Sequence, residues 1–212
     1  MRDALGIALA SGAYAISFGA ISTAAGLSLA QTCVLSLVMF TGASQFALVG
    51  VIGAGGGVWA GAAAAALLGS RNALYGLRLS SVLAVRGWRK LVAPQFVIDE
   101  TTAMAIARDD AAMRRFAFWA TGIALFACWN IGTLIGALAA RAITDPKVLG
   151  LDAAPPAAFL ALLAPRLRAK EPLAIAIASG AVAITILPFV PPGVPLMIVA
   201  LLVTLFGVLR PK

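Results

Sequence analysis

The sequence has few residues that could carry charge or catalysis. Charged residues make up 11% of its 212 positions, histidine is absent, and there are two cysteines. Without histidine, the usual acid–base group at neutral pH and the commonest metal ligand are missing. Cys33 and Cys128 lie far apart in apolar segments, so a small buried side chain is favoured for each over a disulfide or a metal site.

The sequence motifs of several enzyme classes are missing as well. There is no GxxxxGK[ST] phosphate-binding loop, no HExxH zinc motif and no GxSxG nucleophile motif. We therefore predict no catalytic residue, no bound metal and no cofactor. ATP hydrolysis by this chain is not expected.

What the chain does contain is apolar. Hydrophobic residues make up 62% of the sequence, whereas a soluble domain has roughly 45–50%. One soluble core cannot cover so much apolar surface, so lipid must be the solvent for much of the chain. We predict a single integral membrane domain over residues 1–212.

The positive net charge follows the pattern of membrane loops. The charge is +8, from 16 lysines and arginines against 8 acidic residues, and the basic residues fall in small groups between apolar stretches. Arg78–Lys90 and Arg166–Lys170 are the densest groups. Such groups mark cytoplasmic loops, whereas a nucleic-acid binder gathers them on one surface. We predict no nucleic-acid partner, and both termini in the cytoplasm.

The uncharged stretch between Asp3 and Arg71 has room for three spans, predicted at Leu5–Ala25, Cys33–Ile52 and Val58–Leu77. An even number of crossings before Arg78 requires one of them to be broken or re-entrant. The second is the candidate, because Thr41-Gly42-Ala43-Ser44-Gln45 places a weak helix former and small polar groups in its middle.

The rest of the chain adds five apolar segments. Two of them, Pro94–Ala107 and Pro155–Pro165, have about half the length of a span. The prolines of Pro188–Pro195 predict a tight non-helical turn before the last segment. The fold class predicted is an all-α, polytopic membrane helix bundle of about six to eight hydrophobic segments, including broken or re-entrant half-helices. The other three segments are Phe116–Ala140, Leu173–Leu187 and Leu196–Leu209.

The two halves of the chain, 1–110 and 111–212, resemble each other in one place. Phe40–Leu48 and Ala153–Leu162 each follow a long span and run from small residues into Phe and then Ala and Leu. Paired interrupted segments are typical of repeat-built transporters. Chance similarity between alanine-rich helices is the alternative.

The first candidate site is the break itself, formed by Gly42, Ala43, Ser44 and Gln45. A helix broken in the membrane leaves backbone N–H groups that are tolerated only inside protein or beside a watery cavity. Those groups and the positive helix end can hold a carboxylate, with Ser44 and Gln45 adding hydrogen bonds. The alternative is that these side chains only join neighbouring helices.

Two further polar groups could bind a substrate. Arg71 and Asn72 end the uncharged stretch, and Tyr75 lies one helical turn beyond Arg71. They suit either a gating or carboxylate-binding role, or anchoring at the membrane interface. Asn130 is a lone amide in an apolar span, where packing is the alternative to ligand binding.

The last candidate is the adjacent pair Asp99 and Glu100. Acidic residues within an apolar segment are costly in lipid and mark functional sites by default. Burial and mutual repulsion favour protonation of one of them, which suits proton coupling or binding of an ammonium. In an interfacial segment the pair would only balance nearby arginines.

Small residues recur at every fourth position over Gly53, Gly57, Gly61, Ala65 and Gly69. A second set, Gly132 and Gly136, lies in the long span Phe116–Ala140. Each predicts a face that another helix approaches closely, within the chain or in a partner subunit.

Taken in order, these segments resemble the AzlC family, the large subunit of bacterial branched-chain amino acid exporters. The residues that carry the resemblance are FTGASQF at Phe40–Phe46, RNALY at Arg71–Tyr75, Asp99-Glu100 and WNIGTLIG at Trp129–Gly136. One departure is Ala10-Ser11-Gly12, where the family tends to have a proline early in the first span. This difference concerns the gating geometry of that helix.

The resemblance implies export of valine, leucine, isoleucine or similar aliphatic amino acids across the bacterial inner membrane, with a small AzlD-type membrane subunit as partner. The leading hypothesis is thus a proton-coupled secondary transporter subunit. The alternative is a non-transporting scaffold subunit for a separate transport protein.

Overall fold

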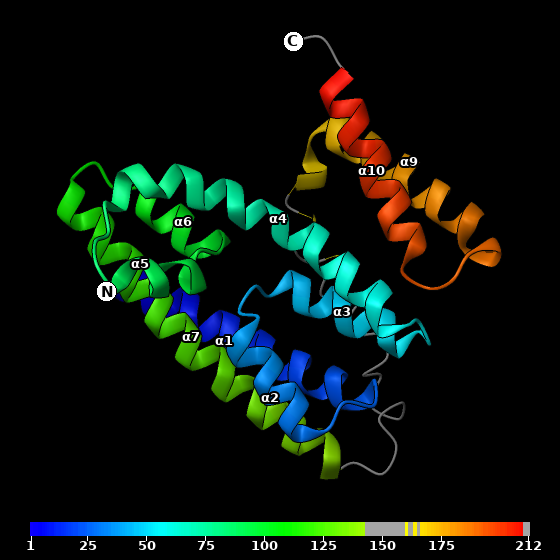
Figure 1. Cartoon of the computed structure of the whole chain (residues 1–212), viewed down its shortest axis with the longest axis horizontal. Coiled ribbons are helices and arrows are strands. Elements are labelled where there is room, and N and C mark those ends of the chain that lie inside the picture. Colours follow the sequence, from blue (N-terminus) through cyan, green and yellow to red (C-terminus); the bar gives the residue numbers. More distant parts are fainter. Residues whose placement is uncertain (143–159, 161–162, 165, 210–212) are drawn as a thin grey trace.

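The structure is a computed structural model and describes residues 1–142, 160, 163–164 and 166–209. Over these residues the chain forms helices and short 3-10 turns and no strand, which confirms the all-α class. Figure 1 shows a bundle built around α1 (Arg2–Ala24) and α7 (Ala111–Ala142), with α9 (Lys170–Ile186) and α10 (Val194–Leu209) forming a separate hairpin.

Three helical stretches in the described part are long and apolar enough to cross a membrane. They are α1, α7 and Lys170–Phe189, which joins α9 to the 3-10 turn η4 (Leu187–Phe189). Shorter apolar helices accompany them, including α2 (Leu29–Val38) and α3 (Ala43–Gly53). This combination confirms a membrane helix bundle, while the number of crossings and the side of each terminus stay predictions.

Glycines hold α1 and α7 in close contact along most of their length. A Cβ atom on Gly19 of α1 would collide with the carbonyl oxygen of Thr133. On α7, Cβ atoms on Gly132 and Gly136 would collide with the carbonyl oxygens of Gly12 and Ile16. Small residues therefore let the two backbones touch, as the sequence predicted for Gly132 and Gly136.

The predicted span Cys33–Ile52 is interrupted, as expected. Helix α2 ends at Val38 and α3 begins at Ala43. Between them Gly42 adopts φ +61° and ψ −90°, a conformation that L side chains rarely adopt. The predicted position of the break needs a correction, because Ala43, Ser44 and Gln45 already form the first turn of α3.

Helix α4 (Val58–Leu83) runs beyond the predicted Leu77. Its C-cap is Ala84, the only non-glycine residue with positive φ in the described part. Its small residues pack against α3 within the same chain. A Cβ on Gly61 would lie 3.0 Å from the Leu48 carbonyl oxygen, and one on Gly69 would lie 3.3 Å from Ser44 Oγ.

The predicted row of small residues is wrong in its first two members. Gly53 is the last residue of α3 and Gly57 is the N-cap of α4, so only Gly61, Ala65 and Gly69 lie on one helix. The intervening Gly55 has φ +82°. The flexible glycine cluster favours a turn there over a continuous helix.

A second interrupted segment follows the basic loop. Helix α5 (Arg89–Val92) and the 3-10 turn η1 (Ala93–Phe96) lead to an extended step at Val97 and Ile98, and then to α6 (Asp99–Ile106). The half-length segment predicted at Pro94–Ala107 is therefore itself divided into two short pieces.

Helices α9 and α10 begin a few residues before their predicted starts, because Pro172 and Pro195 fall in the first turn, where no intrahelical N–H bond is lost. The turn between them is not wholly non-helical as predicted, since Leu187–Phe189 form η4. The 3-10 turn η3 (Arg166–Arg168) precedes α9. The segment Pro155–Pro165 and the repeat segment Ala153–Leu162 lie almost wholly outside the described residues.

Candidate functional site

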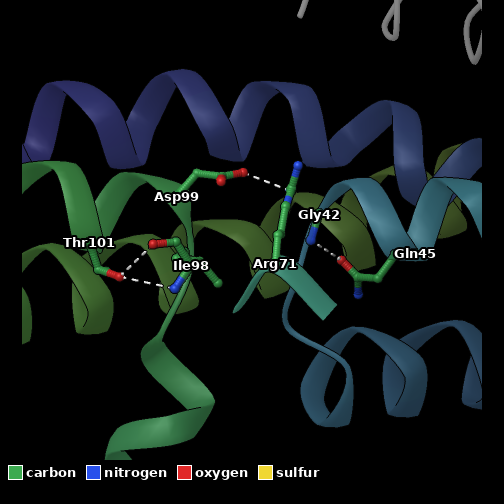
Figure 2. Close-up of polar contacts among 6 residues, drawn as sticks. All are labelled: Gly42, Gln45, Arg71, Ile98, Asp99 and Thr101. Carbon is green, nitrogen blue, oxygen red and sulfur yellow. Dashed lines mark hydrogen bonds and ion pairs between the residues drawn. The ribbon is translucent and has the colours of Figure 1, made fainter. Parts of the chain in front are cut away.

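Gln45 forms hydrogen bonds to both sides of the first helix break. Its side-chain oxygen Oε1 accepts a hydrogen bond from the Gly42 N–H at 3.2 Å (Figure 2), and its Nε2 donates to the Leu35 carbonyl oxygen of α2 at 3.3 Å. The side chain is fully buried. Gln45 thus satisfies the orphan Gly42 N–H and adds a second hydrogen bond to the Leu35 carbonyl oxygen, which also accepts from the Met39 N–H at 2.9 Å.

A second glutamine ties the other interrupted segment to the same helix end. Gln95, in η1, donates from Nε2 to the Leu37 carbonyl oxygen at 2.7 Å. The two breaks are therefore joined through the last turn of α2. The sequence analysis missed Gln95, although an amide side chain next to Pro94 in an apolar segment is a signal that could have indicated it.

At the second break, Thr101 has the place that Gln45 has at the first. Both residues are third in their helix, and each accepts a hydrogen bond from the N–H of the N-cap residue (Figure 2). Thr101 Oγ1 accepts from Ile98 N–H at 3.2 Å, and its hydroxyl can donate to the Phe96 carbonyl oxygen at 2.6 Å. Each break is thus closed by one buried polar side chain.

Arg71 of α4 and Asp99 of α6 form an ion pair between the two breaks. Arg71 Nη2 lies 2.7 Å from Asp99 Oδ2 (Figure 2), and the two side chains are 34% and 39% exposed. Asp99 and Glu100 occupy the first turn of α6, where the helix dipole favours negative charge. The structure brings these predicted residues together from segments far apart in the sequence.

Several predicted polar groups are buried without a partner among the described residues. Ser44 is 1% exposed, and its Oγ has no hydrogen bond. The Nε atom of Arg71 and the Oδ1 atoms of Asn72 and Asn130 are in the same condition, while Asn130 Nδ2 donates to the Phe126 carbonyl oxygen at 2.8 Å. Such groups are costly in a dry interior, so each of them indicates contact with a polar ligand or water.

The predicted residues Ala43 and Tyr75 contribute differently. Ala43 is the first residue of α3, and no backbone hydrogen bond from its N–H or from that of Ser44 is formed within the described part of the chain. Tyr75 is half-buried and packs against the apolar cluster around Leu79 and Leu83. Tyr75 thus lies on α4 within that cluster rather than in the polar group.

An aromatic cluster of Tyr14, Phe18, Phe46 and Trp129 lies behind the first break. Tyr14 and Phe46 have ring centroids 4.9 Å apart, and Phe18 and Phe46 are 5.5 Å apart. A Cβ on Gly42 would lie 3.6 Å from Trp129. Tyr14 Oη and Trp129 Nε1 are buried without a partner among the described residues. The cluster is therefore apolar with two polar atoms, and Tyr14 was missed by the sequence analysis.

Metal-ligating side chains do not gather anywhere in the described residues: no three His, Cys, Asp or Glu side chains lie together. Cys33 and Cys128 are free, half-buried thiols rather than fully buried ones.

The arrangement can bind opposite charges side by side. Unpaired N–H groups at the start of α3, the Ser44 hydroxyl and Arg71 suit an anion, whereas Asp99 and Glu100 suit a cation or a proton. A membrane helix bundle in which interrupted helices meet beside such charges is the architecture of a membrane transport-related subunit.

Comparison with known proteins identifies the family. The AzlC family, described as AzlC protein, matches residues 6–143, which include both breaks and the ion pair. The chain belongs to the AzlC family and is a membrane protein. The inner membrane protein YgaZ of Escherichia coli (strain K12) is 29% identical over 182 residues, covering 82% of this chain and 74% of YgaZ. No solved structure matches the chain.

Proposed function

We propose that the chain is a secondary transporter subunit that exports branched-chain or other aliphatic amino acids across the bacterial inner membrane, coupled to protons. The observation that supports this most is the Arg71–Asp99 ion pair between two helix breaks. In this proposal the chain carries out no catalytic step, needs no cofactor and crosses the membrane several times with both termini in the cytoplasm.

The carboxylate of the amino acid would bind at the start of α3. Ala43 and Ser44 offer backbone N–H groups, and Ser44 offers a buried hydroxyl without a partner among the described residues. Arg71 adds a positive charge, with its Nε edge still unpaired. Helix N-termini and guanidinium groups both favour carboxylates. Gln45, which already bonds to Gly42 and Leu35, would position the break rather than contact the substrate.

The ammonium group would bind to Asp99, and Glu100 would carry the coupled proton. A zwitterion has the same two charges as the ion pair, so it can replace each residue's partner without leaving a charge unpaired. This exchange matters because an isolated charge in a low-dielectric site is expensive. The ion pair would therefore open when substrate binds and close again when substrate leaves.

The side chain of the amino acid would meet the aromatic cluster. Trp129 lies next to Gly42 and packs edge-to-face on Phe46; both rings are buried and would form the apolar wall behind the bound aliphatic group. The export direction and the small AzlD-type membrane partner follow from the family resemblance. The exposed apolar helices α9 and α10 offer a surface to that partner or to lipid.

Uptake of radiolabelled leucine into proteoliposomes that contain the chain and its partner tests this function. We expect uptake that accelerates when a pH gradient is imposed. Arg71→Gln should lower the rate at least about tenfold, because a charge-assisted hydrogen bond contributes about 1.5–3 kcal/mol.

Arg108→Gln is the matched control. Arg108 forms the other ion pair of the described residues, with Asp3, at 3.2 Å in an exposed position, and such pairs contribute about 0–1 kcal/mol. Flux should therefore stay within about fivefold of the wild type. Absence of aliphatic amino acid flux under either condition would contradict the function, and equal losses in both variants would contradict the site.

A further inference from the structure

A groove runs along one face of α4 beside the second interrupted segment. Its volume is about 620 Å³, which is within the range of small-molecule sites. Buried side chains line it on both sides. Leu79 and Leu83 come from α4, and Ala93 and Val97 come from the interrupted segment. At about 1.5 Å per residue, the stretch of α4 from Asn72 to Leu83 extends roughly 16 Å, which is longer than one aliphatic amino acid.

The inner end of the groove lies at the ion pair. Asn72 and Val97 line this end. Asn72 follows Arg71 directly, and Val97 stands two residues before Asp99, at the second break. A molecule at the inner end of the groove would therefore be next to the Arg71–Asp99 pair.

The outer end of the groove lies at the basic loop. Val85 and Lys90 line it, and Lys90 is exposed beside Arg86 and Arg89. A positive charge at the mouth attracts the carboxylate of an approaching molecule.

The polar groups of the groove favour water over a lipid chain as its content. Ser80 and Lys90 are exposed on the groove, and Asn72 is half-buried. Polar side chains that face hydrocarbon are costly, whereas water hydrates them. Ser80 adds a hydroxyl midway along the groove.

We propose that this groove is an aqueous vestibule through which the zwitterionic amino acid passes between the basic loop and the Arg71–Asp99 pair. Lys90 receives the carboxylate at the mouth, Asn72 lines the inner end, and the ion pair closes that end. The inference rests on the proposed transport function and adds the route to the site.

Cysteine labelling tests the route. In a Cys33→Ala, Cys128→Ala background, Gly76→Cys places a thiol in the groove, where an added Cβ has no atom within 4 Å. A charged, membrane-impermeant methanethiosulfonate reagent, present on both sides of the proteoliposome membrane, modifies only thiols that water reaches. We expect rapid modification of Gly76→Cys, at least about tenfold loss of leucine flux, and slower modification when leucine is present.

Leu77→Cys is the matched control. Leu77 is the next residue of α4 but is 73% exposed and does not line the groove. Outside the groove a thiol on α4 is expected to face lipid, which the charged reagent does not enter. Leu77→Cys should therefore be modified slowly and keep its leucine flux. Ser80→Cys, a nearly isosteric change on the groove face, replaces Gly76→Cys if that variant is inactive before labelling.

Two results would overturn the vestibule. One is modification of the groove cysteine no faster than that of Leu77→Cys, which indicates a groove filled by lipid. The other is complete modification of the groove cysteine with unchanged flux. Both results are compared with the leucine flux of the unlabelled cysteine-free protein. If that protein shows no flux before labelling, the proposed function itself has failed, and the two failures can be told apart.

Discussion

Gln45 and Gln31 show how the same hydrogen bond differs in value with its surroundings. Gln45 accepts from the N–H of Gly42 inside the bundle, and Gln31 accepts from the N–H of Ser28 at the exposed start of α2, at 2.8 Å. Water can replace the second bond but not the first. The buried amide is therefore the one that makes a mid-helix break tolerable.

Gln45→Ala should destabilise the protein by about 1–3 kcal/mol, because the Gly42 N–H loses its partner, while the Leu35 carbonyl oxygen keeps its bond from the Met39 N–H. Gln31→Ala should cost less than about 1 kcal/mol. Unfolding of the purified variants in detergent micelles measures both values. Equal losses would mean that the bonds of Gln45 do not stabilise the break.

At the residue scale the sequence predicted which side chains are unusual but not what each one touches. Arg71, Asp99 and Ser44 are conspicuous because polar groups are rare in this chain. That Gln45 binds the backbone, and that Gln95 joins it at the end of α2, depends on how the helices meet. Neighbours along the sequence hold no information about such contacts.

At the scale of helices, the contact between α1 and α7 holds the charged site against a stable frame. Gly12, Gly19, Gly132 and Gly136 lack a Cβ at points where the two helices come closest. Trp129 of α7 and Tyr14 of α1 carry the aromatic cluster on this frame. A change that weakens the contact between α1 and α7 should therefore also disturb the geometry of the proposed site.

Gly19→Ala should destabilise the protein by about 1–3 kcal/mol or more, since overpacked cores lose about this much and the new methyl group would collide with the Thr133 carbonyl oxygen. Gly6→Ala in the same helix meets no atom within 4 Å and should be neutral or stabilising by up to about 1 kcal/mol. Thermal unfolding in micelles compares the two. Equal stability of the two variants would contradict the proposed role of glycine in the contact between α1 and α7.

Helix breaks could be predicted from the sequence more readily than helix partners. Gly42 with its polar neighbours indicated the first break, whereas the second was not predicted, because Pro94–Ala107 was expected to be one half-length segment. The row of small residues from Gly53 to Gly69 was wrong as a continuous face, because a four-residue spacing fits a helix but cannot show where the helix begins. The three glycines at Gly55–Gly57 end the pattern there.

At the scale of the whole molecule, the apolar composition predicted the membrane and the all-α class without any contact being known. The proposed site depends on a few exceptions to that composition. Helices α4 and α6 bring these residues together from opposite sides of the basic loop. Two opposite charges, unpaired helix-end amides and an apolar cluster in one place match a small aliphatic zwitterion. Recognition of both charged ends of that molecule is the central claim.

Equilibrium binding by the detergent-purified chain with its partner tests this claim most directly, by comparing leucine with leucinol, which lacks the carboxylate, and with 4-methylpentanoate, which lacks the ammonium. Each lost charge-assisted contact is worth about 1.5–3 kcal/mol. The account predicts that both analogues bind at least about tenfold more weakly than leucine. Equal affinity of either analogue and leucine would contradict it.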